Sequence, residues 1–284
     1  MTLLDPTAIP ADDRAFLLGD GLFETVRLYR GRPFRLEAHL ERLEEGAERL
    51  GIPVPGDLRG RVERALEEWD DREGALRITL SRGTGAGFAP APGRDPLAAV
   101  QIREWRPDPR WWTEGFRAHL TGRVHTGALT AGIKGIGYLE RIQALRDART
   151  RGGDEAVLLN ERGLAMGGSA SNLLVVEGQW VAAPGPEAGA LPGVTRGVVL
   201  EVLDGAGYRI REEGVEPDAF SRASEVLLTS SLREVVPVVR VGKDVVGSGA
   251  PGPVLMIALQ GLRERVASEL GLQDVQPGGS ASGT

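Results

Sequence analysis

The sequence of 284 residues has no cysteine, and it has only two lysines and three histidines. Without cysteine the chain cannot form disulfides, thiolate zinc sites, iron–sulfur clusters or a cysteine nucleophile, and the absence fits a reducing compartment. The histidines are His39, His119 and His125, and none lies four residues from another or in an H-E-x-x-H pattern. We therefore expect no metal site.

Long apolar runs and an excess of positive charge are missing as well. The run VLMIAL at 254–259 is far shorter than the roughly 20 residues of a membrane-spanning helix. The N-terminal segment has acids where a signal peptide needs cations. The net charge is -6 and no basic patch is visible, which argues against nucleic acid or a membrane surface as partner. With 41% hydrophobic and 26% charged residues, we expect a globular protein of the cytoplasm.

The scarcity of lysine makes the two positions that have it, Lys134 and Lys243, informative. All other basic residues are arginine, so a retained lysine indicates a need for an amine that can lose its proton and form an imine. Lys134 lies in the glycine-rich segment GIKGIG, whereas Lys243 lies in an expected hairpin turn. On the residues alone, both can also be read as ordinary surface lysines.

Hydrophobic patterning divides the chain at a proline-containing segment, 106–112, which we interpret as a domain linker. We expect a mixed α/β (α+β) fold with a small N-terminal domain at 1–110, a larger domain at 111–275 that carries Lys134, and a disordered tail at 276–284. The expected elements are hairpins at 21–34 and 154–184, strands at 75–81, 97–105, 116–125 and 226–231, and helices at 35–50, 57–69, 138–151 and 253–270. A further helix is expected to follow the segment 191–196 and to end at Gly205 or Gly207.

Two glycine-rich motifs do not carry the chemistry that they first suggest. The segment GSGAPG at 247–252 spells G-x-G-x-x-G, but an expected hairpin precedes it, and the acid at the expected ribose distance falls near the C-terminal end. We therefore reject a dinucleotide site there. The segment GGSASN at 167–172 lacks the second glycine of a nucleophile elbow, and its small residues instead allow a ligand to approach the backbone.

Small polar residues recur at the ends of several expected elements. Each one alone is a common turn or cap residue, but together they offer hydroxyl and amide donors that suit a phosphate group. A phosphate cradle combined with one imine-forming lysine is what pyridoxal 5'-phosphate requires. The residues are Ser169, Ser171 and Asn172, the segment LPGVTR at 191–196, and Thr229, Ser230 and Ser231.

Six segments, spread from about residue 14 to 265, occur in an order that is typical of one enzyme family. They are DRAFLLGDGLFETVR (13–27), FRLEAHLERL (34–43), IKGIGYLERI (133–142), GGDEAVLLNERGLAMGGSASNLLVVEG (152–178), LPGVTR (191–196) and EVLLTSSLREVVPV (225–238). In these segments the chain resembles the fold-type IV pyridoxal-phosphate enzymes, which include class IV aminotransferases of branched-chain or D-amino acids and aminodeoxychorismate lyases.

The resemblance implies a role for each matching residue. Lys134 is the lysine that forms the imine with the cofactor, Arg42 binds the cofactor phosphate, and Tyr138 lies near the phenolic oxygen of the cofactor. Without the resemblance, Arg42 reads as one more solvated charge on a helix, like Arg49. The implied cofactor-binding set is Arg42, Lys134, Tyr138, Gly167, Ser171, Asn172, Val194, Thr195, Ser230 and Ser231.

The chain departs from the resembled family at two positions. Gly167 stands where the family has a glutamate that keeps the pyridine nitrogen protonated, so the electron-sink strength of the cofactor is expected to be lower. A Gly167→Glu change is expected to reach that nitrogen and speed the reaction. If water or a displaced acid already supplies the proton, the new side chain is expected instead to crowd the pocket and lower activity. Ala86 stands where lyases and D-amino acid aminotransferases often place an arginine for the substrate carboxylate, and Arg27 or Arg82 is expected to substitute.

The resemblance implies a homodimeric aminotransferase that moves an amino group between a small amino acid or amine and a keto acid. Two alternatives stay open at this point. One is a 4-amino-4-deoxychorismate lyase, which eliminates pyruvate and leaves 4-aminobenzoate. The other, suggested by Gly167, is a pyridoxal-phosphate-binding homologue with weakened catalysis.

Overall fold

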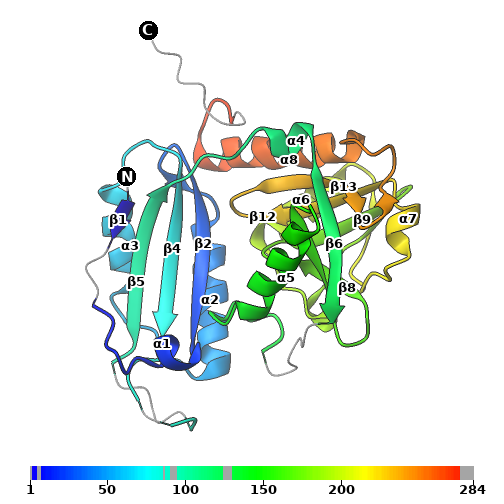
Figure 1. Cartoon of the computed structure of the whole chain (residues 1–284). Coiled ribbons are helices and arrows are strands. Elements are labelled where there is room, and N and C mark those ends of the chain that lie inside the picture. Colours follow the sequence, from blue (N-terminus) through cyan, green and yellow to red (C-terminus); the bar gives the residue numbers. More distant parts are fainter. Residues whose placement is uncertain (1, 5–7, 86, 90–94, 124–129, 276–284) are drawn as a thin grey trace. The chain divides into compact units, whose positions relative to one another are not determined.

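The structure is a computed structural model that describes residues 2–4, 8–85, 87–89, 95–123 and 130–275 (Figure 1). The chain forms two compact units. Unit 1 comprises Met1–Arg106 and Ile133–Tyr138, and unit 2 comprises Pro107–Gly132 and Leu139–Thr284. The mixed α/β fold expected from the sequence is confirmed.

Unit 1 is built on a five-stranded antiparallel sheet in the order β1-β5-β4-β2-β3. Its β2–β3 hairpin turns through Arg30 and Gly31, whose φ angles of 47° and 75° belong to the left-handed region. A two-residue turn of this kind matches the twist of the flanking strands and fixes their register. The strands are β1 (Thr2–Leu4), β2 (Gly21–Tyr29), β3 (Arg32–Pro33), β4 (Gly74–Ser81) and β5 (Leu97–Glu104).

One face of this sheet is covered by the two longer helices of unit 1 (Figure 1). Leu40, Leu43 and Ala47 form the apolar stripe of α2 and pack in the core with the sheet. Gly51 ends α2 with a φ of 61°, the conformation that favours glycine at this position. The helices are α1 (Arg14–Leu18), α2 (Leu36–Leu50) and α3 (Leu58–Glu67).

Unit 2 is built on a nine-stranded mixed sheet in the order β11-β10-β9-β12-β13-β6-β7-β8, with β14 paired to β13. Its core is dominated by valine and leucine side chains from adjacent strands, as expected for strands buried on a face. The strands are β6 (Phe116–Arg123), β7 (Glu155–Leu159), β8 (Ala165–Gly168), β9 (Asn172–Glu177), β10 (Trp180–Ala182), β11 (Arg209–Arg211), β12 (Glu225–Ser230), β13 (Glu234–Val241) and β14 (Asp244–Val245).

The helices of unit 2 pack against this sheet. Helix α5 contacts β6 and β7, while α6 and α8 contact each other and β12. No helix among the described residues is both long and apolar enough to cross a membrane. The helices are α4 (Arg110–Thr113), α5 (Leu139–Thr150), α6 (Val194–Gly205), α7 (Ala219–Arg222) and α8 (Pro253–Leu270), with a short 3-10 helix at Pro186–Ala188.

The organisation differs from the sequence prediction in the placement of the lysine segment. The segment 133–138 belongs to unit 1 and not to the C-terminal domain, because its backbone pairs with β2 through a bridge between Leu22 and Gly135. Part of the expected linker at 106–112 is helical, since α4 begins at Arg110. The expected disordered tail at 276–284 lies outside the described residues.

Candidate active site

Lys134 is held at the edge of β2 by backbone hydrogen bonds on both sides. The Phe23 amide donates to the Lys134 carbonyl at 3.0 Å, and the Ile136 amide donates to the Gly21 carbonyl at 3.0 Å. Glycine is required at 21, because an added Cβ would lie 2.5 Å from both the Ile136 side chain and the Leu80 carbonyl. These hydrogen bonds fix the backbone of the lysine segment against β2, so the Lys134 side chain extends from a fixed backbone position.

The Lys134 amine lies among aromatic side chains. Its Nζ is 4.5 Å from the Phe23 ring centroid and 3.5 Å from the Tyr138 hydroxyl, and the two rings meet edge to face at 5.1 Å. Burial lowers the pKa of Lys134, although the Tyr138 hydroxyl and the Glu24 carboxylate oppose this shift. An amine with a lowered pKa is deprotonated more often and is a better nucleophile.

A buried carboxylate, Glu24 on β2, organises the charges next to Lys134. Glu24 is fully buried, and its two oxygens accept from Arg42 Nε at 2.7 Å and Arg42 Nη2 at 2.8 Å. His39 Nδ1 lies 2.7 Å from the same carboxylate. Burial raises the pKa of Glu24, but the hydrogen bonds from His39 and Arg42 outweigh burial and lower it to about 2. Glu24 is therefore a permanent anion beside the lysine.

The contact with Glu24 fixes the direction of the Arg42 side chain. His39 and Arg42 are three residues apart on α2, so they share a face of the helix. A bidentate contact with a carboxylate holds a guanidinium in a defined plane. Arg42 is thus more than a solvated helix charge, and its role towards a phosphate stays a prediction.

Arg77 on β4 is a second cation near the lysine, and the sequence analysis did not single it out. Its guanidinium carbon lies 3.5 Å from the Phe23 ring centroid, and its Nε donates to the Thr79 hydroxyl at 3.3 Å. Among the described residues, no carboxylate is paired with it. Burial lowers the pKa of Arg77 to about 10. A partly buried arginine without an anion is suited to accept one from a ligand.

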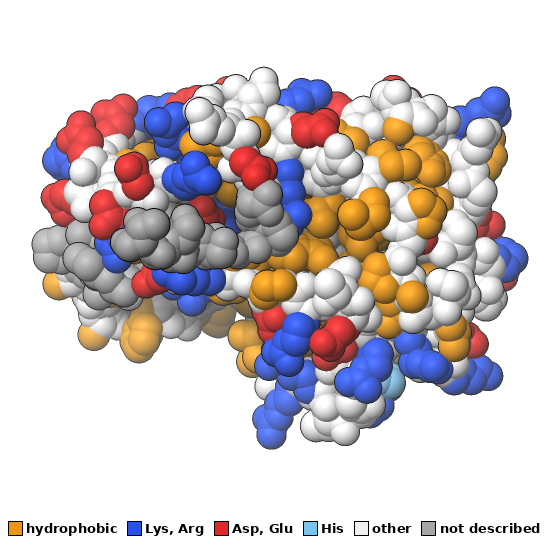
Figure 2. All heavy atoms as spheres, turned by 90° about the horizontal axis from the view of Figure 1, so that it is seen from above, with side chains coloured by type: hydrophobic (Ala, Val, Ile, Leu, Met, Phe, Trp, Pro, Cys, Tyr) orange, Lys and Arg blue, Asp and Glu red, His pale blue; other side chains and the backbone are white. Residues whose placement is uncertain are grey.

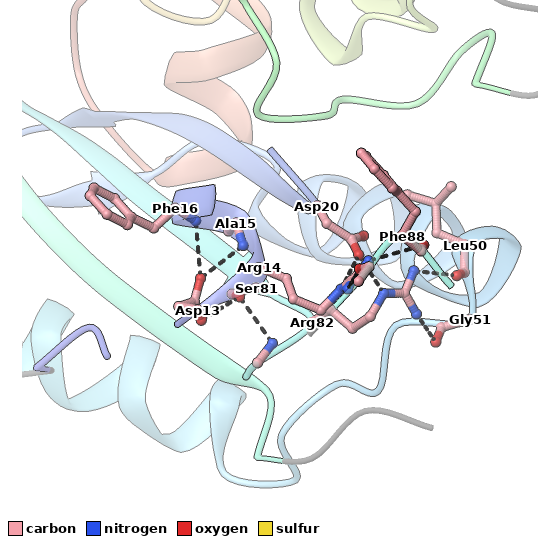
Figure 3. A network of polar contacts seen from close by, with 12 residues as sticks. Asp13, Arg14, Ala15, Phe16, Asp20, Leu50, Gly51, Ser81, Arg82 and Phe88 are labelled. Carbon is pink, nitrogen blue, oxygen red and sulfur yellow. Dashed lines mark hydrogen bonds and ion pairs between the residues drawn. The ribbon is translucent and has the colours of Figure 1, made fainter. Parts of the chain in front are cut away.

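The two arginines expected to bind the substrate carboxylate have partners inside unit 1. Arg82 donates to Asp20 at 2.8 Å and to the carbonyls of Gly51 and Leu50 at 2.7 and 2.8 Å (Figure 3). Arg27 is buried and donates to Glu73 at 2.5 Å. In this structure both guanidiniums stabilise unit 1, and their proposed substrate role stays a prediction. Ala86 lies outside the described residues.

In unit 2, the turn between β8 and β9 presents a buried hydroxyl. The Gly168 amide donates to the Ser171 carbonyl at 2.9 Å and closes the turn. A Cβ at Gly168 would collide with Ser171 Oγ, and this buried oxygen has no hydrogen-bond partner among the described residues. Asn172 donates to the Leu191 carbonyl at 2.7 Å, which ties the turn to the segment that leads into α6.

The N-terminus of α6 adds free backbone donors beside this turn. Gly193 is the N-cap and has no side-chain cap, so the amides of Val194 and Thr195 at the positive end of the helix dipole are open to an anion. A Cβ at Gly193 would collide with Asn172 Oδ1. This collision shows that the helix start lies against β9.

The end of β12 supplies the third group of hydroxyls. Thr229 pairs with Asn172 across the β12–β9 ladder, and its buried Oγ1 also lacks a partner among the described residues. Ser230 Oγ accepts from the Arg233 amide at 3.3 Å, and Ser231 follows in the same turn. Unpaired buried hydroxyls are uncommon in native proteins, and those of Ser171 and Thr229 are available to a polar ligand.

The structure leaves no room for a side chain at Gly167. An added Cβ would lie 2.8 Å from the Ser171 carbonyl oxygen, and that oxygen belongs to the backbone of the turn. A side chain at 167 therefore requires this backbone to shift, and the expectation that Gly167→Glu reaches a cofactor nitrogen stays a prediction. Adding the side chain would move the turn that presents Ser171.

The G-x-G-x-x-G motif at 247–252 has a structural explanation. Gly252 is the N-cap of α8, and the Glu225 carboxylate accepts from the amides of Val254 at 2.7 Å and Leu255 at 3.0 Å. The start of α8 is thus occupied by a side chain of the protein, in contrast to the uncapped start of α6. This supports the rejection of a dinucleotide site.

Sequence reasoning missed Glu24 and Arg77 as site residues. The signal for Glu24 was an acid inside an otherwise apolar strand, GLFETVRLY, followed by His39 and Arg42 at helical spacing. No comparable signal marks Arg77, because arginine is the common basic residue of this chain.

Known proteins share sequence with this chain over most of its length. The family model of amino-transferase class IV matches residues 21–241. The D-alanine aminotransferase of Bacillus licheniformis is 28% identical over 272 residues, which cover 92% of this chain and 93% of that protein. The aminodeoxychorismate lyase of Bacillus subtilis (strain 168) is 28% identical over 235 residues, which cover 81% of this chain and 80% of that protein.

A solved structure shows the same fold. The fold IV-transaminase CpuTA1 from Curtobacterium pusillum matches with a TM-score of 0.80 and 27% identity, covering 93% of this chain and 90% of that chain. The chain therefore belongs to the class IV aminotransferase family. Enzymes of this family depend on pyridoxal phosphate.

Proposed function

We propose that this protein is a pyridoxal-phosphate-dependent aminotransferase in which Lys134 is the catalytic lysine. The observation that carries the proposal is the setting of Lys134, a partly buried amine with a lowered pKa beside Phe23, Tyr138 and the Glu24–Arg42 pair. The other lysine, Lys243, lies in the turn between β13 and β14 and has no comparable surroundings.

The donor set of unit 2 fits the phosphate of this cofactor. The orphaned hydroxyls of Ser171 and Thr229 and the uncapped start of α6 at Val194 and Thr195 are all neutral donors. Such donors bind a phosphate dianion well. In unit 1 the proposed cofactor-binding residues are Arg42, Lys134 and Tyr138. In unit 2 they are Gly167, Ser171, Asn172, Val194, Thr195, Ser230 and Ser231.

Different residues of this chain have different roles in the proposed amino transfer. When bound, pyridoxal phosphate supplies an electron-withdrawing ring that stabilises negative charge at the substrate α-carbon. Lys134 would hold the cofactor through Nζ, and the same amine would carry the proton to and from the substrate α-carbon. Tyr138 OH orients Nζ at 3.5 Å. Arg77 binds the substrate carboxylate, because its guanidinium has no anion of its own among the described residues.

A panel of amino donors and keto acids tests the proposal. The loaded protein, mixed with single amino acids, is expected to convert them to keto acids and to pass the amino group to an added keto acid. The alternative is the lyase reaction, to which the similarity of the Bacillus subtilis protein gives equal support at 28% identity. With 4-amino-4-deoxychorismate a lyase releases pyruvate and 4-aminobenzoate and needs no keto acid.

Gly167 bears on catalytic strength. Without an acid at this position the ring nitrogen of the cofactor has no carboxylate from residue 167 to keep it protonated. We expect Gly167→Glu to weaken cofactor binding by about tenfold, because the new Cβ meets the Ser171 carbonyl at 2.8 Å. Fluorescence titration of the apo protein measures the change. Tighter binding and faster amino transfer in the variant would show that the turn yields and that the missing acid limits the enzyme.

We further propose that the protein is a homodimer of the cytoplasm. The dimer is supported by exposed apolar surface, which in globular proteins often marks an interface. The side chains of Phe16, Leu17 and Leu18 on α1 are exposed, as are Met256 and Ile257 on α8. Figure 2 looks onto the α8 side and shows hydrophobic side chains gathered in the part formed by unit 2. Light scattering at several concentrations measures the assembly state.

A further inference from the structure

Glu155, the first residue of β7, is a fully buried carboxylate that the proposed reaction does not use. One of its oxygens accepts from the Ser169 amide at 3.1 Å, from the Ser169 hydroxyl and from the Ala156 amide at 3.0 Å. The other oxygen accepts from Arg233 Nη1 at 2.9 Å. A buried carboxylate is costly unless its lone pairs are satisfied, and here they are.

The two oxygens of Glu155 hold two different turns. The first turn, residues 168–172, joins β8 to β9 and contains Ser169 and the orphaned Ser171 hydroxyl. The second turn, residues 230–234, follows β12 and contains Ser231 and Arg233. The strands beside these turns are neighbours in the sheet, since Thr229 pairs with Asn172. Glu155 is therefore a single anchor for two adjacent hydroxyl-bearing turns.

The second turn is fixed on its other side as well. Glu234 has a φ of 59°, a conformation that is strained for a glutamate. Its buried carboxylate accepts from Arg263 Nε at 2.9 Å and Nη2 at 2.7 Å. The adjacent residues Arg233 and Glu234 thus each form an ion pair, Arg233 as the cation with Glu155 and Glu234 as the anion with Arg263. These two ion pairs hold the turn in its strained conformation and fix its position.

We propose that Glu155 is a positioning residue, which sets the two turns in the arrangement that presents Ser171 and Ser231 to the cofactor phosphate. This inference rests on the proposed cofactor. Glu155 touches the turns and does not itself touch the ligand. Removing its charge releases Arg233 and weakens the hold on Ser169, so the hydroxyls lose their common alignment while the core of unit 2 keeps its apolar contacts.

The test compares Glu155→Gln with Glu201→Gln, which removes a carboxylate from an exposed pair with Arg265 on the same unit. The measurements are the Kd of pyridoxal phosphate by titration of the apo protein, the 31P NMR shift of the bound phosphate, and the unfolding temperature of the apo protein. For Glu155→Gln we expect the Kd to rise about tenfold, the scale seen when a partner of a ligand-binding side chain is lost, together with a shifted 31P signal. Glu201→Gln should leave both unchanged.

Ser169→Ala provides a second variant should Glu155→Gln fail to fold. It removes one donor to Glu155 without burying an unpaired charge, and a smaller rise in Kd with a 31P shift in the same direction is expected. An unchanged Kd and 31P signal in either folded variant overturns the positioning role, as does a lowered unfolding temperature with both phosphate readouts unchanged. Failure of the unaltered protein to bind pyridoxal phosphate is a different result, which overturns the proposed function and this inference with it.

Discussion

Unit 1 contains two arginine–carboxylate networks that look alike in composition and differ in what surrounds them. In the first, Asp20 accepts from Arg14 and Arg82 at 2.8 Å each (Figure 3). In the second, Glu24 accepts from Arg42 and His39 at 2.7 Å each. The remaining donors of Arg14 and Arg82 go to backbone carbonyls of Gly87, Leu50 and Gly51. The first network therefore joins loops, whereas the second lies beside the Lys134 amine.

The two networks differ in the group that lies beside the arginine–carboxylate pair, and not in the geometry of the pair itself. Apart from Asp20 itself, the acceptors found for Arg14 and Arg82 among the described residues are backbone carbonyls. Near Glu24 the structure provides an amine whose pKa responds to the network: Glu24 raises this pKa and Arg42 lowers it. We therefore propose that the Asp20 network is structural and that the Glu24 network belongs to the active site.

The largest expected effect comes from replacing the neighbour itself. Lys134→Arg keeps a positive charge beside Glu24 but removes the nucleophilic amine. We expect amino transfer to fall by about a thousandfold or more, as for loss of a covalent catalyst, with cofactor retained only noncovalently. Steady-state assays measure the rate. Lys243→Arg is the matched control and should be as active as the unaltered protein; similar activity in both variants would remove Lys134 from the mechanism.

Removing each carboxylate in turn measures how much each network contributes to the free energy of unfolding. Glu24→Gln leaves Arg42 buried without its anion, which should lower the free energy of unfolding by about 4 kcal/mol. Asp20→Asn should cost about 2 kcal/mol, since Asp20 is partly exposed at 18%. Urea unfolding measures both values.

Cofactor binding separates the two roles. Of the two variants, Glu24→Gln should also weaken binding of pyridoxal phosphate, because Glu24, and not Asp20, is hydrogen-bonded to Arg42. Equal loss of cofactor affinity in Asp20→Asn would break the distinction between the networks.

Acid should lower the stability that the Glu24 network provides as the pH falls from 4.5 towards 2. The pKa of Glu24 falls from 4.5 to about 2 on folding, so the folded protein binds this proton less tightly than the unfolded chain. Its contribution of about 3 kcal/mol is complete above pH 4.5 and is lost as the pH falls towards 2. The pKa of His39 is also lowered, chiefly by burial, which acts in the same direction below pH 6.5. Unfolding at several pH values should give a steeper loss in the unaltered protein than in Glu24→Gln.

The smallest expected effect concerns Arg77, a cation near the same lysine without a carboxylate partner. Arg77→Gln should lower kcat/KM by about tenfold to a hundredfold for carboxylate substrates, the value of one charge-assisted contact, and should change stability little. Arg103→Gln on the neighbouring strand is the control, because Arg103 also lies near an aromatic ring, 5.4 Å from Trp105. Equal kinetics in the two variants would argue that Arg77 binds no substrate carboxylate.

The sequence predicted most elements because local rules determine them. The Arg30–Gly31 turn, the apolar stripe of α2 and its glycine stop all follow from spacing and turn chemistry. The position of the lysine segment was harder to predict from the sequence. It belongs to unit 1 because residues 133–138 pair with β2, a contact between segments more than 100 residues apart that no local pattern contains.

The candidate site was only partly predictable for the same reason. Lys134 stood out by composition, and Arg42 by its resemblance to a motif. Glu24 and Arg77 become site residues through contacts across the sheet and to Phe23. Arg82 matched a plausible role in sequence, yet its guanidinium is bound by Asp20 and two carbonyls, which only the folded chain shows.

The most direct test of the central claim is to locate the covalent attachment of the cofactor in the unaltered protein. The loaded protein is reduced with borohydride, digested, and mapped by mass spectrometry. We expect a pyridoxyl group on the peptide that contains Lys134, since burial lowers the pKa of this amine. A pyridoxyl group on Lys243, or on neither lysine, would contradict it.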